Sequence, residues 1–449
     1  MIPEWKADGR EVAIVGLGRS GMAAGLLLRE HGVPVYASDT AKGDAYDAWA
    51  ARLREAGAVV ELGSHDLERI RRAAAVVVAP GVPPEVPPLA AAREAGVPVH
   101  AEVDLGLSAL GRTRYIAITG TNGKTTTTSL IGHAMGRIGM RGETAGNIGR
   151  PVSDVARLAD PPEWLALELS SFQLHDMPHV DPAVGVLTNL APNHLDRYPT
   201  LDAYYGDKAL LFRNAGPAST WVVNADDAAV EAMVRDVPGR QRRFSIVTRS
   251  DAWFDRQAGS LMLGGRSVLD RNRLPLLGDH NVANALAALL ALESVGADAE
   301  AVAEAFTTFR AIPHRVEPVR EVGGVLWIND SKSTNVTSTA VAVAALERPF
   351  VLLLGGRHKG EPYTRLIPLL EERCRAVVAY GESGGLVESD LGGAVRVVRG
   401  GTFDEVISRA GAEARPGDAV LLSPACSSYD MFHNYEERGE AFRAAVEAM

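Results

Sequence analysis

Residues 117–128 read AITGTNGKTTTT, an apolar start followed by two glycines, a lysine and a final run of four threonines. From Gly120 to Thr125 the spacing is G-x-x-G-K-T, directly after the strand-like segment YIAIT. A loop of this kind joins a strand to a helix, and its backbone amides and lysine hold phosphate groups. The longer form of the loop needs a glycine where this chain has Ile118, so the loop is a shortened one. Short G-x-x-G-K strings arise by chance, but the position between strand and helix favours nucleotide binding.

The same order of strand, glycine-rich turn and helix recurs along the chain. Three examples pair a strand-like segment with a helix-like one: 11–15 with 22–29, 115–119 with 125–138, and 350–354 with 363–371. This alternation predicts an α/β fold with parallel sheets and crossover helices.

Two segments, GLSALGRTR (106–114) and FRAIPHRVEPV (309–319), interrupt the pattern and indicate domain boundaries. We therefore predict three domains. They are a Rossmann-like domain at 1–102, a central P-loop ATPase-type domain at 103–311 and a C-terminal Rossmann-like domain at 312–449.

Composition excludes several classes of protein. A net charge of -10 argues against nucleic-acid binding, which requires clustered basic residues. The two cysteines, Cys374 and Cys426, have no metal-site spacing and fit a reducing cytoplasm. The beginning, MIPEWKADGR, has no apolar signal region, and we find no stretch near the ~20 apolar residues of a membrane helix. We expect a cytoplasmic protein that binds neither membranes nor nucleic acid.

A second glycine motif lies in the first domain. VAIVGLGRSG places Gly16, Gly18 and Gly21 after a strand, and Asp39 ends the next strand. This pattern matches the dinucleotide fingerprint, so the motif alone favours a nicotinamide cofactor and an NAD-dependent oxidoreductase. Two other interpretations stay open: a turn that serves only strand–helix packing, and a different nucleotide diphosphate at the same helix end.

Three further side chains of the central domain are candidates for metal binding and chemistry. Glu168 ends an apolar strand, where magnesium carboxylates often lie; otherwise it is a solvated strand end. His194 follows another strand, at an edge where α/β sites form, although a lone histidine is more often structural. Lys208 has apolar neighbours on a predicted helix, and by default it is a surface lysine with a packed stem.

Nine segments together resemble the Mur ligase family over essentially the whole chain. They are GTNGKTTT (120–127), AGNIG (145–149), ELSSFQL (168–174), NHLDRY (193–198) with Lys208 downstream, HNVANALAA (280–288), PHR (313–315), NDSKSTN (329–335), LLLGGRHKG (352–360) and LLSPACSSYDMFHNYEERG (421–439). Other branches fit less well. The alanine-adding member usually has histidine where Asn122 stands, the diamino-acid-adding member carries a D-N-P-R motif, and folylpolyglutamate synthases lack the first domain.

The resemblance implies an ATP-dependent ligase of peptidoglycan precursor synthesis. ATP would phosphorylate the terminal carboxylate of UDP-N-acetylmuramoyl-L-alanine, and the amine of D-glutamate would attack the resulting acyl phosphate. The first glycine motif would then hold the uridine diphosphate of the substrate. We expect ATP and Mg²⁺ as cofactors, a carbamylated Lys208, and a monomer.

The resemblance also implies a role for individual positions. Lys124, His194 and Lys208 would be catalytic. The metal ligands would be Thr125, Glu168, His194 and Lys208. The ATP-binding residues would be Gly120, Thr121, Asn122, Gly123, Lys124, Thr125, Thr126, Asn281, Asn284, Arg315 and Asp330. The UDP-linked substrate would contact Gly18, Arg19, Ser20, Asp39, Thr40, Gly81, Asn147, Gln173 and His194. D-glutamate would contact Lys332, Thr334, Lys359, Ser428 and Tyr435, with Lys332 and Lys359 on neighbouring loops at the carboxyl edge of the third sheet.

The chain departs from the family pattern at three positions. Asn193 stands where the family usually has aspartate, Ala41 follows Thr40 where a basic residue can help hold the uridine diphosphate, and Tyr435 replaces a phenylalanine. Arg315 and Asp330 lie beyond the second boundary whereas Lys124 lies before it, so we expect the third domain to close upon nucleotide binding.

Overall fold

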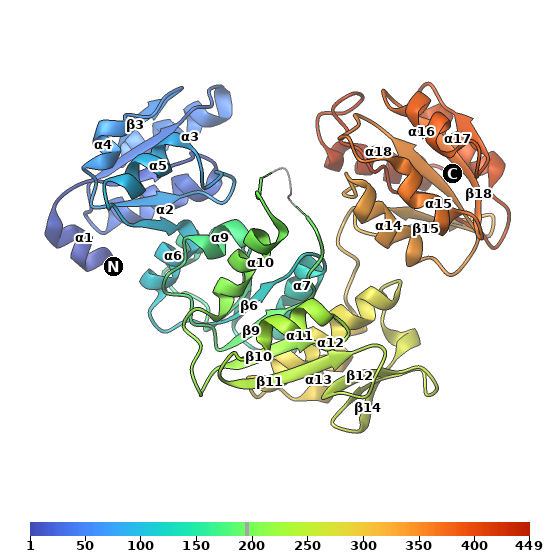
Figure 1. Cartoon of the computed structure of the whole chain (residues 1–449), viewed down its shortest axis with the longest axis horizontal. Coiled ribbons are helices and arrows are strands. Elements are labelled where there is room, and N and C mark those ends of the chain that lie inside the picture. Colours follow the sequence, from blue (N-terminus) through green and yellow to red (C-terminus); the bar gives the residue numbers. More distant parts are fainter. Residues whose placement is uncertain (194–196) are drawn as a thin grey trace. The chain divides into compact units, whose positions relative to one another are not determined.

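The computed structural model describes residues 1–193 and 197–449 (Figure 1). These residues form two compact units. The first unit is Met1–Leu274 with Val282–Thr308, and the second is Pro275–Asn281 with Phe309–Met449. The division at Phe309 coincides with the start of the second boundary segment. The first boundary segment lies inside the first unit, where residues 106–110 form the second half of a helix and Arg114 begins the strand before the phosphate loop.

The first unit begins with a parallel sheet in the order β3-β2-β1-β4-β5. Its strands are β1 (Val12–Val15), β2 (Val35–Asp39), β3 (Val59–Leu62), β4 (Ala75–Val78) and β5 (Val99–Ala101). Its helices are α1 (Ile2–Asp8), α2 (Arg19–Glu30), α3 (Asp44–Glu55), α4 (Leu67–Arg71) and α5 (Pro87–Glu94). Every residue of β1 is buried, as expected for a central parallel strand covered on both faces.

The second sheet of this unit has the order β14-β13-β12-β11-β10-β9-β6-β8-β7. Its strands are β6 (Arg114–Thr119), β7 (Gly142–Gly146), β8 (Trp164–Glu168), β9 (Val184–Leu187), β10 (Thr220–Asn224), β11 (Arg240–Ser245), β12 (Ala252–Asp255), β13 (Ser260–Leu263) and β14 (Arg266–Asp270). β12, β13 and β14 pair antiparallel, and the other neighbours pair parallel.

The helices that accompany this sheet follow the predicted alternation. They are α6 (Glu102–Leu110), α7 (Lys124–Arg137), α8 (Val152–Ala156), α9 (Ser171–His175), α10 (Leu201–Ala209), η1 (Leu210–Phe212), α11 (Ala228–Val234), η2 (Arg271–Arg273), α12 (Asp279–Ser294) and α13 (Ala299–Phe306). β6 lies between β8 and β9, so the segments that follow these three strands meet at one edge.

The second unit is built on a third sheet, in the order β15-β16-β20-β17-β18-β19. Its strands are β15 (Glu317–Val322), β16 (Val325–Asn329), β17 (Phe350–Gly355), β18 (Cys374–Tyr380), β19 (Val397–Arg399) and β20 (Ala419–Leu422). Its helices are α14 (Val336–Ala344), η3 (Tyr363–Leu366), α15 (Ile367–Leu370), α16 (Gly384–Leu391), α17 (Phe403–Glu413) and α18 (Tyr435–Glu447). Only β15 pairs antiparallel, with β16.

Two expectations about elements are settled by the fold. The predicted α/β class with parallel sheets and crossover helices is confirmed. The predicted helix at 363–371 is instead a 3₁₀ turn followed by one short α-helix, since Pro368 occupies the first turn of α15 and cannot donate a backbone hydrogen bond. Among the described residues, no helix combines the length and apolar character needed to cross a membrane.

Candidate functional site

The phosphate loop joins β6 to α7, as the sequence predicts. Gly120 and Gly123 have φ angles of 141° and 81°. A Cβ atom on Gly120 would collide with Thr188 Oγ1, and one on Gly123 would collide with Asn284 Oδ1. Glycine is therefore required at both positions by backbone conformation and by space. Thr125 and Thr126 follow in the first turn of α7.

Asn189, which follows β9, holds the loop in shape. Its backbone carbonyl accepts a hydrogen bond from Thr121 N at 2.9 Å, and its Oδ1 accepts one from Asn122 N at 2.9 Å. Asn189 Nδ2 also donates to Asn122 O at 3.0 Å. Lys124 Nζ donates to the carbonyls of Gly120 and Thr121. The sequence indicates Asn189 as a residue at the end of a buried strand, but it assigns this residue no role in the site.

Lys208 lies beneath the phosphate loop and is only 1% exposed. Its Nζ donates to Gly120 O at 2.7 Å and lies 4.7 Å from the ring centroid of Tyr204. Burial and then the charge of Lys124 lower the pKa of Lys208 well below its ordinary value, while Glu168 and Asp207 oppose this shift. The default interpretation of Lys208 as a surface lysine is therefore wrong.

Glu168 ends β8 and is also 1% exposed, so it is not a solvated strand end. Its Oε1 accepts a hydrogen bond from Asn147 Nδ2 at 2.8 Å. Its Oε2 is buried and has no hydrogen-bond partner within residues 1–193 and 197–449. A buried carboxylate oxygen without a donor is costly unless a cation compensates its charge. Glu168 therefore fits the predicted role of a magnesium ligand.

The other candidates of the central segment have the following local contacts. Asn284 is buried beside the loop and accepts a hydrogen bond from Thr127 Oγ1 at 3.3 Å. Asn281, which is assigned to the second unit, donates to Leu277 O at 2.8 Å. Gln173 is buried, and its Oε1 accepts a hydrogen bond from Ser170 N in a helix-capping box. His194 lies outside the described residues.

A cavity of about 790 Å³ lies at the carboxyl end of β1 and β4 in the first sheet. Seven predicted residues line it: Gly18, Arg19, Ser20, Asp39, Thr40, Gly81 and Asn147. Asp39 accepts hydrogen bonds from the backbone amides of Leu17 at 2.6 Å and Ala41 at 2.8 Å, so its carboxylate braces the glycine turn. Asn147 both lines this cavity and binds Glu168, which connects the cavity to the phosphate-loop site.

The candidate D-glutamate residues gather at one edge of the third sheet. Lys332 follows β16, Ser428 follows β20 and Lys359 follows β17. β20 separates the other two strands in the sheet, but the loops after them still meet, since Lys359 Nζ donates to Thr334 Oγ1 at 3.2 Å. Lys332 Nζ lies 5.3 Å from the ring centroid of Tyr435. Ser428 Oγ is buried and has no hydrogen-bond partner among the residues that the structure describes.

Asp330 supports the turn that carries Arg315. The residues on either side of Arg315 have left-handed backbones, with φ of 63° at His314 and 43° at Val316. Asp330 Oδ1 accepts a hydrogen bond from Val316 N at 3.1 Å, and Oδ2 accepts one from Ser423 Oγ at 2.7 Å. Burial raises the pKa of Asp330 to about 6, although these hydrogen bonds oppose the shift.

Arg438 is a residue that the sequence did not indicate. Its guanidinium is completely buried and donates to Ser331 Oγ at 3.0 Å, Ser331 O at 2.9 Å and Cys426 O at 3.2 Å. Arg438 thereby joins the loop after β16 to the loop after β20. An arginine in the first turns of a helix usually faces solvent, so the sequence around Arg438 carries no signal of its burial.

Comparison with known proteins agrees with the resemblance. Family models match in three consecutive segments: the Mur ligase MurD-like N-terminal domain at 10–101, the Mur ligase middle domain at 118–292, and the Mur ligase glutamate ligase domain at 314–426. A UDP-N-acetylmuramoylalanine–D-glutamate ligase of Acidobacterium capsulatum is 40% identical over 98% of this chain and 96% of its own. One from Salinibacter ruber is also 40% identical, over 97% of each chain.

The chain belongs to the Mur ligase family.

Solved structures of Mur ligases share the fold. UDP-N-acetylmuramate-alanine ligase MurC from Thermotoga maritima superposes with a TM-score of 0.62 at 19% identity, covering 98% of this chain and 99% of that one. MurF from Acinetobacter baumannii gives 0.62 at 16% identity, covering 97% and 93%. At these identities the likeness concerns the fold alone.

Membership of the Mur ligase family corrects the interpretation of the first glycine motif. The N-terminal Mur ligase segment contains Gly16, Gly18 and Gly21, and both relatives are ligases. The alternative of an NAD-dependent oxidoreductase is therefore wrong. Mur ligases are ATP-dependent, in agreement with the phosphate loop between β6 and α7.

Proposed function

We propose that the chain ligates D-glutamate to UDP-N-acetylmuramoyl-L-alanine at the expense of ATP, in peptidoglycan precursor synthesis. The observation that carries this proposal is the position of Asn147, which lines the cavity of the first sheet and binds Glu168 beside the phosphate loop. A long substrate with its uridine diphosphate in the cavity would extend past Asn147 toward the phosphorylation site. The names of the relatives support the same reaction.

The reaction has two covalent steps. A terminal carboxylate oxygen of the UDP-linked substrate attacks the γ-phosphorus of ATP, and the bond from that phosphorus to the bridging oxygen breaks to release ADP. The amine of D-glutamate then attacks the acyl carbon, loses a proton, and expels inorganic phosphate as the amide forms. Two anions must approach in the first step, so the ammonium of Lys124 and the amides of the loop from Gly120 to Gly123 are needed to reduce their repulsion.

We propose that Lys208 is carbamylated. Its amine would add to carbon dioxide, lose a proton and become a carbamate, which is an oxygen ligand for a metal ion. A buried amine directly under Gly120 O is well placed for this role, because a carboxylate-like group there would face the phosphate site. Thr125, Glu168, carbamylated Lys208 and the sequence-predicted His194 would hold magnesium. Bound magnesium would neutralise charge on the reacting phosphate and carboxylate.

The cavity of the first sheet suits the uridine diphosphate end of the substrate. α2 begins at Arg19 directly after Gly18, so the amides of its first turn are available to an anion. Arg19, Ser20 and Thr40 would add polar contacts to the diphosphate, and Gly81 lines the opposite strand end.

The edge of the third sheet suits D-glutamate, a dicarboxylate. Lys332 and Lys359 supply two cations, and Thr334, Ser428 and Tyr435 supply hydroxyl groups. We further propose that Asn281, Asn284, Arg315 and Asp330 contribute to nucleotide binding.

The limits 1–102, 103–311 and 312–449 are our proposed domain boundaries. Each one encloses a single matched Mur ligase segment. We propose that the enzyme acts as a monomer.

A phosphate-release assay tests the proposed function. With ATP, magnesium and UDP-N-acetylmuramoyl-L-alanine present, D-glutamate should stimulate phosphate release and L-glutamate should not. Lys124→Ala should abolish the D-glutamate-dependent signal. Equal stimulation by both enantiomers, or release that does not depend on the UDP-linked substrate, would contradict the proposal.

A further inference from the structure

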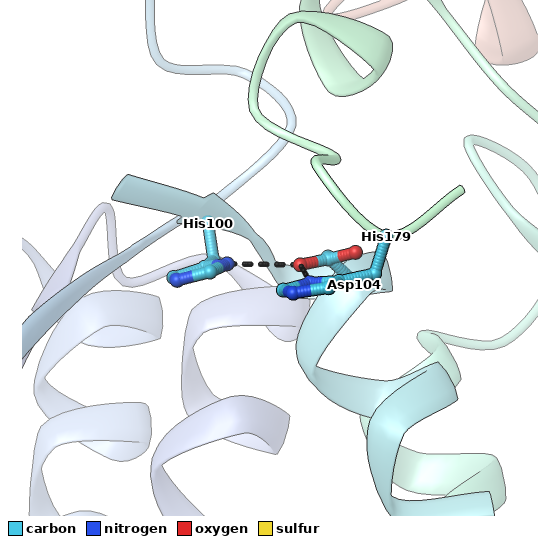
Figure 2. A group of neighbouring side chains, drawn as sticks. All are labelled: His100, Asp104 and His179. Carbon is cyan, nitrogen blue, oxygen red and sulfur yellow. Dashed lines mark hydrogen bonds and ion pairs between the residues drawn. The ribbon is translucent and has the colours of Figure 1, made fainter. Parts of the chain in front are cut away.

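A cluster of two histidines and one aspartate lies outside all of the sites described above (Figure 2). His100 is in β5, Asp104 is in the first turn of α6, and His179 is in the segment between α9 and β9. All three belong to the first unit. His100 Nδ1 lies 2.9 Å from Asp104 Oδ2, and His179 Nδ1 lies 3.0 Å from the same oxygen.

Asp104 is a buried carboxylate in need of positive charge. It is 2% exposed, and within residues 1–193 and 197–449 its ion pairs are those with the two imidazoles. A buried carboxylate is costly unless its charge is compensated. An imidazole N–H donor compensates such a charge only in part, whereas a divalent cation bound by both rings and the carboxylate compensates it fully.

The geometry of the cluster fits the coordination of a metal ion. The two imidazole planes are nearly parallel, at 7°, with centroids 5.7 Å apart, and both direct Nδ1 at one oxygen. The three ligand atoms all lie within 4.8 Å of one another. A tetrahedral zinc ion with bonds of about 2.0–2.1 Å separates its ligands by roughly 3.3 Å, so small side-chain rotations would admit the ion.

We propose that His100, Asp104 and His179 bind a divalent transition-metal ion of the zinc class. Two imidazoles and one carboxylate form a ligand set typical of such ions, with a fourth position for water. The side chain of His179 is 63% exposed, so the site is open to the ion and to that water. Each neutral imidazole would coordinate through Nδ1 and carry its proton on Nε2.

The proposed ion ties segments that other contacts already bring together. Ala101 N donates to Asp176 O at 2.7 Å, and Arg93 pairs with Asp176 at 3.0 Å. Trp5 packs edge-on against His100, with ring centroids 5.5 Å apart, which fixes the orientation of that ligand. The ion would therefore be structural, joining the end of the first Mur ligase segment to the middle one.

Titration with Co²⁺ tests the site without reference to ligase activity. The chelator-treated full chain, without nucleotide, should bind Co²⁺ and develop the strong visible absorption of a tetrahedral centre, and Zn²⁺ should displace it. His179→Ala and Asp104→Asn should each weaken binding by at least about tenfold. His31→Ala is the matched control, since His31 is an exposed histidine of the same unit that contacts a backbone carbonyl, and it should leave binding unchanged.

Two further measurements separate this site from others. Glu168→Gln should retain the tetrahedral Co²⁺ signal, because Glu168 belongs to the proposed magnesium site. Zn²⁺ should raise the thermal unfolding midpoint of the parent chain but not of His179→Ala, a change at an exposed side chain that should preserve folding. The proposal would be overturned if the parent chain did not bind Co²⁺, or if Asp104→Asn bound it as tightly as the parent chain. Either result would mean that the three side chains form only a hydrogen-bonded cluster.

Discussion

At the scale of single residues, Lys208 and Glu168 share one physical feature. Both are charged residue types near the phosphate loop, and each is only 1% exposed. Lys208 donates to one loop carbonyl, and Glu168 keeps one oxygen without a protein donor. Burial of such groups costs free energy, so their presence supports the proposed catalytic roles.

Replacing Lys208 by alanine should nearly abolish ligase activity. If the lysine acts as a carbamate, short carboxylic acids such as acetate should partly restore activity by supplying the missing oxygen ligand. Phosphate release with and without added acetate measures this effect. Lys6→Ala, at an exposed lysine of α1, is the control and should alter stability by no more than about 0.5 kcal/mol. Full activity of Lys208→Ala would show that the lysine has no catalytic role.

The sequence motifs could indicate Lys208 and Glu168 as candidate site residues, but the local sequence could not predict that their side chains are buried. Lys208 lies on a short helix with both polar and apolar neighbours, so its sequence pattern is that of a surface lysine. Its burial arises because α10 packs beneath a loop that is 88 residues earlier in the chain. Tertiary packing of this kind leaves no periodic signal in the sequence.

At the scale of elements, each of the three sheets has candidate residues in loops that follow the carboxyl ends of its parallel strands, although Lys208 and Asn284 lie on helices. The glycine turn follows β1, the phosphate loop follows β6, and the candidate D-glutamate residues follow β16, β20 and β17. Backbone amides and side chains from separate strands converge only at this edge. The alternation of strands and helices was therefore sufficient to predict that these candidate loops follow the carboxyl ends of strands.

Replacement of Lys359 by alanine should weaken the binding of the acceptor, D-glutamate, and leave the binding of the UDP-linked substrate unchanged. Loss of one charge-assisted contact costs about 1.5–3 kcal/mol, so Lys359→Ala should raise the KM for D-glutamate roughly ten- to a hundredfold. The KM for UDP-N-acetylmuramoyl-L-alanine should stay almost unchanged. Arg357→Ala, in the same loop, is the matched control, because Arg357 is exposed and pairs with Glu382 at 2.9 Å. A higher KM for the UDP-linked substrate with an unaltered KM for D-glutamate would refute the assignment of this sheet edge as the D-glutamate site.

Arg438 should act as a positioning residue for the same edge. Arg438→Met removes the donors that hold Ser331 O and Cys426 O, and we expect a higher KM for D-glutamate with an almost unchanged KM for the UDP-linked substrate. Arg438→Lys should restore little, because one ammonium cannot reproduce the planar fork of donors. Arg409→Met, at an exposed ion pair on α17, is the control. If Arg438→Met lowers the unfolding midpoint without altering either KM, the residue is structural only.

At the scale of the whole molecule, linear motifs were sufficient to predict the family and the order of the three segments. The metal cluster could not be predicted in this way. His100 and His179 are 79 positions apart, and Asp104 lies between them without a recognised spacing. Only the packing of β5 and α6 against the segment before β9 brings these side chains together. Sites assembled from distant segments require the fold.

The stability of the second unit should depend on pH through Asp330. The pKa of Asp330 rises from an ordinary 3.8 to about 6, chiefly because the carboxyl group is completely buried. Between these values the folded chain keeps a proton that the unfolded chain has released, so stability is lost as pH rises toward about 6. Above that pH the ionised, buried group costs on the order of 3 kcal/mol relative to acid conditions, at about 1.4 kcal/mol per pKa unit.

Asp330→Asn should remove this dependence. Asparagine stays neutral and keeps an oxygen to accept the hydrogen bond from Val316 N, so the variant should gain stability relative to the parent chain as pH rises from about 4 to 6. Urea unfolding at several pH values measures this difference in stability. Asp404→Asn changes an exposed aspartate of the same unit and should show no such trend. If the free energies of unfolding of Asp330→Asn and the parent chain differ by the same amount at every pH in this range, Asp330 ionises normally in the folded protein.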